Sequence, residues 1–150
     1  MRSPLHIALS VALLVSMCAG STHAQNAGDL ERNKKVVLDF YRHVFEAQNP
    51  AAAADFLTED YIQHNPRVAT GRAAFVEFFS KIWKTPKPVE ATLRDPPAIL
   101  MAEGDLVTLV FKRMKPEPAD ATKQYESFWF DTFSVNAAGK IVEHWDGGLK

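Results

Sequence analysis

The sequence predicts a single-domain α+β protein whose helices precede its strands. In the first half of the chain, apolar residues recur every three or four positions, which is the period of an amphipathic helix. In the second half, short apolar runs are separated by turn residues, which is typical of antiparallel strands. Helices followed by a run of strands favour a fold in which the helices cover one face of a curved sheet.

The first 24 residues have the layout of a secretory signal peptide. Arg2 supplies the positive charge, and the apolar run from Leu5 to Met17 is shorter than a permanent membrane-spanning helix usually is. Thr22 and Ala24 are small enough for the −3 and −1 sites, so we predict cleavage after Ala24. The mature protein is then exported, periplasmic or secreted, with no stable membrane anchor. A buried N-terminal helix is the alternative interpretation.

The only cysteine, Cys18, lies inside this segment. Met17 stands where a lipoprotein signal carries a small residue, so the lipidation motif is matched only in part. Cleavage after residue 24 of 150 leaves 126 residues without cysteine, enough for one domain held by its core alone.

The charge pattern argues against nucleic-acid binding. Without Arg2 the chain has 16 Lys and Arg against 18 Asp and Glu, a net charge of −2, and its basic residues are scattered. Ten Phe, three Trp and three Tyr predict a core or cavity walled by aromatic rings.

Three helices are predicted, at residues 30–47, 51–57 and 72–83. Asn49-Pro50 separates the first two, and Gly71 precedes the third, whose apolar side is rich in phenylalanine. An extended segment at 61–66 is stopped by Pro66.

The remainder is predicted to form strands at residues 89–94, 98–102, 106–114, 124–135 and 140–146. A tight turn is expected at 103–105, a proline-containing loop at 115–123 and a short turn at 136–139.

The last strand does not sort into an apolar and a polar face. Ile141, Glu143 and Trp145 alternate with Val142, His144 and Asp146. This mixture is expected of a polar pocket set into an apolar core, and equally of an edge strand.

The strand before it contains a second anomaly. Asp131 shares a face with Trp129, Phe133 and Val135. A carboxylate there is paired, protonated or functional, unless it lies at a sheet rim with its oxygens in water.

In the extended segment, His64 adjoins the Asn65-Pro66 turn signal. Taken alone, Asn65 is either a turn residue only or part of a site, and His64 is either a functional group or a buried histidine bonded to backbone.

Two segments carry a resemblance to a known family. They are Tyr61-Ile-Gln-His-Asn-Pro66 and Gly139-Lys-Ile-Val-Glu-His-Trp-Asp146, with Gly71 and the Phe-rich helix between them. Together they resemble the SnoaL-like polyketide cyclases of the nuclear transport factor 2-like superfamily, in particular the branch of predicted aldol-condensation enzymes. The similarity covers nearly all of the mature chain.

The resemblance implies a cone-shaped, strongly bent antiparallel sheet (the fold is also called cystatin-like), with three N-terminal helices enclosing a pocket. It implies a catalytic set drawn from His64, Asp146, His144 and Asp131. It also implies ligand contacts from Tyr61, Asn65, Phe79, Trp83, Trp129 and Trp145. By motif position, Asp146 is similar to the last-strand aspartate of limonene epoxide hydrolases, and His64 falls near their water-positioning asparagine. Members of this fold commonly form a homodimer through the outer sheet face.

The sequence departs from these relatives in three places. The strand 106–114 lacks the Arg-x-Asp arrangement of the epoxide hydrolases, which disfavours epoxide hydrolysis, and Phe111 stands where relatives often carry histidine. The segment after Asp146 is short, so we expect one pocket wall to be missing or supplied by a partner chain.

Two functions follow as hypotheses. The first is a cofactor-independent acid/base enzyme (a cyclase, isomerase or aldol-type enzyme) acting on a small apolar carbonyl compound. Asp146 or Asp131 would be the base, and His64 and His144 would polarise the carbonyl oxygen or relay the proton. The second is a non-catalytic protein that binds a small apolar molecule.

A metal site at His64, His144 and Asp146 is disfavoured, because the chain has no H-x-H or HExxH pattern.

Overall fold

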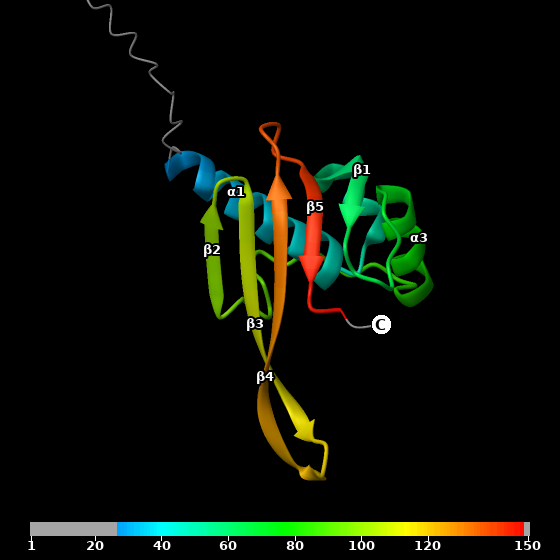
Figure 1. Cartoon of the computed structure of the whole chain (residues 1–150). Coiled ribbons are helices and arrows are strands. Elements are labelled where there is room, and N and C mark those ends of the chain that lie inside the picture. Colours follow the sequence, from blue (N-terminus) through cyan, green and yellow to red (C-terminus); the bar gives the residue numbers. More distant parts are fainter. Residues whose placement is uncertain (1–26, 149–150) are drawn as a thin grey trace, which may run out of the picture.

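The computed structural model describes residues 27–148 (Figure 1). The predicted signal peptide at 1–24, its cleavage site and Cys18 lie outside the described residues. Within residues 27–148, no helix has the length and apolar character needed to cross a bilayer.

The helices form where their periodicity predicts them. Helix α1 (Ala27–Phe40) continues directly into the π-helix η1 (Tyr41–Glu46). Pro50 opens the short 3-10 helix η2 (Pro50–Ala52), which continues into α2 (Ala53–Phe56). Helix α3 (Arg72–Ile82) follows Gly71, whose φ of 102° favours glycine.

Five strands form one sheet in the order β1-β5-β4-β3-β2. The strands are β1 (Leu57–Gln63), β2 (Ile99–Glu103), β3 (Leu106–Glu117), β4 (Asp120–Val135) and β5 (Ile141–Asp146). Strands β2 to β5 pair antiparallel, but β1 runs parallel to β5. The α+β class with three helical segments on a curved sheet is confirmed, whereas the expectation of a purely antiparallel sheet is wrong. A long connection joins β1 to β5, so no hairpin forces the two strands to run in opposite directions.

One strand prediction and one loop prediction are wrong. Residues 89–94 form no strand, because the connection from α3 to β2 bonds to the end of the first helix instead. There Arg42 Nη1 donates to Ala91 O at 2.7 Å, and Lys87 N donates to Ala47 O at 2.7 Å. The predicted loop at 115–123 is largely strand, so β3 and β4 form a long hairpin whose tip projects beyond the other strands (Figure 1).

The helices cover one face of the sheet, with α1 crossing behind it in Figure 1. The core lies between them and includes Phe40, Leu57, Phe75, Val107, Leu109, Phe133 and Ile141. The opposite face carries exposed apolar side chains from the three strands β2, β3 and β4, among them Ile99, Met101, Met114, Phe128 and Phe130.

Candidate functional site

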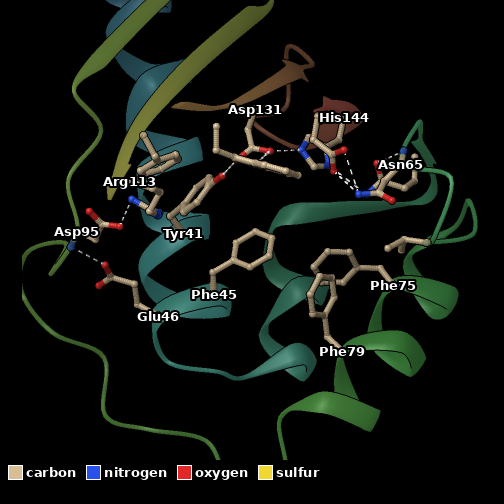
Figure 2. A pocket seen from close by; sticks show the side chains of 15 residues that line it. Tyr41, Phe45, Glu46, Asn65, Phe75, Phe79, Asp95, Arg113, Asp131 and His144 are labelled. Carbon is tan, nitrogen blue, oxygen red and sulfur yellow. Dashed lines mark hydrogen bonds and ion pairs between the residues drawn. The ribbon is translucent and has the colours of Figure 1, made fainter. Parts of the chain in front are cut away.

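A cavity of about 360 Å³ opens between the helices and the inner face of the sheet (Figure 2). Both family segments line it, through Gln63 and Asn65 from the first and His144 and Asp146 from the second. Its volume lies in the lower part of the range of small-molecule sites. The remaining wall is largely aromatic and comprises Tyr41, Phe45, Phe75, Phe79, Phe111 and Trp129.

The π-helix directs three side chains of one turn into this cavity. Its wide turn is visible in bonds that span five residues, from Ala47 N to Arg42 O at 3.1 Å and from Asn49 N to Val44 O at 3.0 Å. Tyr41, Phe45 and Glu46 all line the cavity. In an α-helix, the residue five positions on points away from the first, so the wider turn is what brings Glu46 to the same side as Tyr41.

The register of the last two strands places Asp131, His144 and Asp146 at the cavity, with Phe133 in the core beneath His144. Asp131 pairs with Asp146 and Phe133 pairs with His144 across β4 and β5. The Phe133 and His144 rings are stacked, with centroids 4.2 Å apart. An irregularity near Val135 shifts the pairing, so Ile141 is also fully buried.

Asp131 is buried, and three different side chains donate hydrogen bonds to it. It is only 5% exposed. Its Oδ1 accepts hydrogen bonds from Trp129 Nε1 at 2.9 Å and His144 Nε2 at 3.1 Å, and its Oδ2 accepts one from the Tyr41 hydroxyl. The alternative position at a sheet rim with its oxygens in water is therefore not what the structure shows. Asp131 instead fixes three side chains of the cavity wall.

The tautomer of His144 follows from its neighbours. Asn65 N donates to Gln63 Oε1 at 3.0 Å, which turns the Gln63 amide nitrogen towards His144 Nδ1, 3.0 Å away. Nδ1 must then accept, so Nε2 carries the hydrogen that is donated to Asp131. Both ring nitrogens of His144 are occupied, and its side chain is a fixed part of the wall.

Asp146 is held differently. Asn65 Nδ2 lies 3.0 Å from its Oδ1 and 2.8 Å from its Oδ2, and Gly148 N donates to Oδ1 at 2.7 Å. Arg67 N donates to Asn65 Oδ1 at 2.9 Å, which fixes the orientation of this amide. Asp146 lines the cavity, and its Oδ2 has no other donor within residues 27–148, so Oδ2 is the carboxylate oxygen with more capacity to accept a proton.

The far end of the cavity is polar as well. Arg113 Nη1 forms an ion pair with Asp95 Oδ2, and the guanidinium lies 5.0 Å from the centroid of the Phe111 ring. Glu46 accepts the backbone N–H groups of Arg94 and Asp95, each at 3.0 Å, and thereby anchors this loop to the π-helix. Figure 2 shows this group at the opposite side of the cavity from Asn65.

Two tyrosines next to the carboxylates are strongly held in the neutral form. Burial is the main cause that raises the pKa of Tyr41 well above 10.0, and the adjacent Asp131 carboxylate adds to it. Burial, followed by the charges of Asp146 and Asp131, likewise raises the pKa of Tyr61. Both phenols therefore stay protonated across the physiological pH range.

Asp131, His144 and Asp146 also bring one ligand atom each within 4.8 Å of one another. This is a different set from the one considered in the sequence, because His64 is not part of it. Within the cavity, however, the His144 and Asp131 atoms are already bonded to each other. A metal ion would have to break that bond, so the donor set fits an ion poorly.

The predicted site residues divide into two groups. Asn65, Phe79, Trp129, Asp131, His144 and Asp146 line the cavity. His64 lies outside it: its Nε2 is 2.6 Å from Glu143 Oε1, and its ring stacks on Trp145, which is also outside. Tyr61 is fully buried and accepts a hydrogen bond from Gln63, and Trp83 stacks on Phe79 without lining the cavity.

Several cavity residues were missed by the sequence reasoning. Tyr41 and Phe45 look like ordinary members of an apolar helix stripe, and Glu46, Asp95 and Arg113 lie in segments without a motif. Gln63 alone had a usable signal, because it belongs to the first family segment.

Comparison with known proteins assigns the family. The model of the SnoaL-like domain matches residues 37–144, which is most of the chain. The chain belongs to the SnoaL-like family. No curated protein matches it.

Solved structures show the same nuclear transport factor 2-like fold. A SnoaL-like polyketide cyclase homologue from Jannaschia sp. CCS1 is 14% identical with a TM-score of 0.56, covering 82% of this chain and 90% of that one. SalBIII, an epoxide hydrolase/cyclase-like enzyme of pyran ring formation in salinomycin, is 22% identical with a TM-score of 0.54, covering 77% and 89%. TerC, co-crystallised with polyporic acid, is 16% identical with a TM-score of 0.54, covering 79% and 92%. At these identities the likeness shows the fold alone.

Proposed function

We propose that this SnoaL-like protein is a cofactor-independent acid/base enzyme that removes a proton next to the carbonyl group of a small apolar compound. Asp146 is the base. The observation that carries the proposal is the partly exposed Asp146 carboxylate beside an aromatic cavity, whose Oδ2 accepts only from Asn65. The Asp131 carboxylate, in contrast, is buried and is held by three side chains.

The chemistry needs no other reactant. A carbon-bound proton next to the carbonyl passes to Asp146 Oδ2, the C–H electron pair forms a C=C bond, and the carbonyl π pair moves onto oxygen as an enolate. Return of the proton at another position gives isomerisation. Attack of the enolate carbon on a second carbonyl moves the π pair of that carbonyl onto its oxygen, which takes the proton back from Asp146, and the product is a cyclised or aldol compound.

The other cavity groups orient the substrate and the base. Asn65 holds the Asp146 carboxylate, and the Asp131–His144–Gln63 chain fixes one wall. The Phe45, Phe75 and Phe79 rings supply apolar contact and exclude water.

One observation favours the alternative, a non-catalytic binding protein. Two hydrogen-bond donors of the cavity wall could stabilise an enolate oxygen, the Tyr41 hydroxyl and the His144 Nε2–H. Both of them donate to Asp131 instead. An enzyme normally presents such donors to the developing charge. A binding protein needs only the cavity and its open carboxylate oxygen.

Deuterium exchange of 2-tetralone in D₂O distinguishes the two functions. Proton NMR measures loss of the signals next to the carbonyl, with and without protein. We expect acceleration by the wild type and a loss of at least about 100-fold in Asp146→Asn, the usual scale of general-base catalysis. His64→Ala is the matched control and should retain the rate, because this side chain lies outside the cavity. Binding of 2-tetralone without exchange would support the binding protein.

Export and self-association are further parts of the proposal. Sequencing the N-terminus of the protein recovered outside the cytoplasm tests cleavage after Ala24, and an intact Met1 there would contradict it.

The exposed apolar side chains of the outer sheet face support a homodimer. Sedimentation analysis tests this, and a dimer should be weakened by Phe130→Glu.

A further inference from the structure

The exposed or partly exposed polar groups of the cavity that keep hydrogen-bonding positions lie at its two ends. Every polar group of Gln63, Trp129, Asp131 and His144 that faces the cavity is bonded to another residue. Asp146 Oδ2 keeps an open position at one end. At the other end, Arg113 uses Nη1 for Asp95 Oδ2 and Lys112 O, and Nε and Nη2 have no partner within residues 27–148. Asp95 Oδ1 is likewise open.

This second end is a built structure. Asp95 belongs to the connection between α3 and β2, and Glu46 holds this connection by accepting the N–H groups of residues 94 and 95. Arg94 Nη2 donates to Glu46 O at 2.6 Å. Arg113 is fixed by its ion pair and by the face of Phe111. Donor and acceptor therefore lie side by side at a fixed place (Figure 2).

We propose that Arg113 and Asp95 form a second subsite, which binds an uncharged hydroxyl group at the end of the ligand remote from Asp146. The ligand is then an elongated, uncharged molecule with an apolar middle that lies against Phe45, Phe75 and Phe79. The inference deepens the proposed function and rests on it only for the placing of the reacting end at Asp146.

A hydroxyl group matches what the pair offers. Its oxygen accepts from an Arg113 N–H group, and its hydrogen is donated to the open Asp95 oxygen. A carboxylate would gain from Arg113 but would be repelled by Asp95. A hydrocarbon group would displace water from the Arg113 N–H groups without offering them a hydrogen-bond acceptor in return.

Equilibrium dialysis of three probes at pH 7 tests the subsite. They are 2-naphthol, naphthalene-2,6-diol and 6-hydroxy-2-naphthoate, which differ only in the group at the far end. We expect the diol to bind about ten-fold more tightly than 2-naphthol. The diol is symmetric and can bind in two equivalent orientations, but this alone would account for a factor of only about two. The naphthoate should bind more weakly than the diol. Arg113→Gln should reduce the diol preference to about two-fold, and Asp95→Asn should improve naphthoate binding.

Lys115→Gln is the matched control. Lys115 lies two residues along the same strand and beside Arg113 at the surface, but it does not line the cavity. Its substitution removes the same charge and should retain the diol preference.

Three results would overturn the subsite: equal affinities for diol and 2-naphthol in the wild type, an unchanged preference in Arg113→Gln, or no binding of either probe at millimolar concentration. The Asp146→Asn variant separates this inference from the proposed function. If that variant leaves 2-tetralone exchange and probe affinity unchanged while Arg113→Gln abolishes the diol preference, the proposed base is wrong and the subsite stands. If the diol preference is absent while exchange still depends on Asp146, the opposite holds.

Discussion

Asp131 and Asp146 face each other across β4 and β5, yet their surroundings differ in a way that separates their roles. Asp131 accepts hydrogen bonds from three side chains and is almost completely buried. Asp146 is held by Asn65 and a backbone N–H group and keeps one position open. The same residue type is a positioning group in one place and a candidate base in the other, because Asp131 is buried among three side chains that depend on it, whereas Asp146 is partly exposed beside the cavity.

Substitution of Asp131 should have the largest effect. Asp131→Ala leaves the buried N–H groups of His144 and Trp129 and the Tyr41 hydroxyl without their acceptor. Each buried unpaired group is costly, so we expect the free energy of unfolding to fall by about 3 kcal/mol or more. Urea denaturation measures it. Asp146→Ala is the control and should cost less than about 1 kcal/mol, because this carboxylate is partly exposed; equal losses would remove the distinction between the two sites.

Alkaline pH should lower the free energy of unfolding, in part through Tyr41, which is bonded to Asp131. The folded protein raises the pKa of Tyr41 above 10.0, so the folded state retains a proton that the unfolded chain loses. The stabilisation is fully present below pH 10 and is lost as pH rises towards the folded pKa, by about 1.4 kcal/mol per pH unit for each such tyrosine. Urea denaturation between pH 8 and 11 should show this decline, with a shallower slope in Tyr41→Phe. Identical slopes in the two proteins would contradict the assignment to Tyr41.

A single methyl group added at Gly148 should disturb the contact between Asn65 and Asp146. A Cβ at Gly148 would lie 2.5 Å from Asn65 Nδ2 and 2.8 Å from Asp146 Oδ1, which is too close for either to stay in place. We expect Gly148→Ala to lower 2-tetralone exchange by about ten-fold, since one hydrogen bond to a charged group is disturbed. At Gly147 the nearest atom to a Cβ, on the Trp129 ring, is 3.9 Å away, so Gly147→Ala is a matched control. A similar loss in both variants would indicate a general effect on the chain end.

The sequence was a good guide to the elements and a poor guide to which side chains face the cavity. Helix and strand positions follow from local periodicity, which Pro50 and Gly71 reinforce. The 89–94 segment has strand-like composition, but it bonds to the helix end, and no local pattern contains that partner. In the first family segment, Gln63 and Asn65 line the cavity while His64 between them points out, as alternation along an extended chain requires.

By itself, the amino-acid sequence determined the α+β order of elements, the SnoaL-like family and the two segments that meet at the cavity. Only the tertiary structure decided that Asn65 rather than His64 contacts Asp146, that Asp131 is buried and bonded to three side chains, and that Arg113 and Asp95 form a second polar end. Alternation in a strand states which residues share a side, but packing against other segments decides which side is buried, and the irregularity near Val135 interrupts even that alternation. Hydrogen-bond occupancy depends on partners brought from distant parts of the chain, such as Tyr41, and is therefore fixed only when the chain folds.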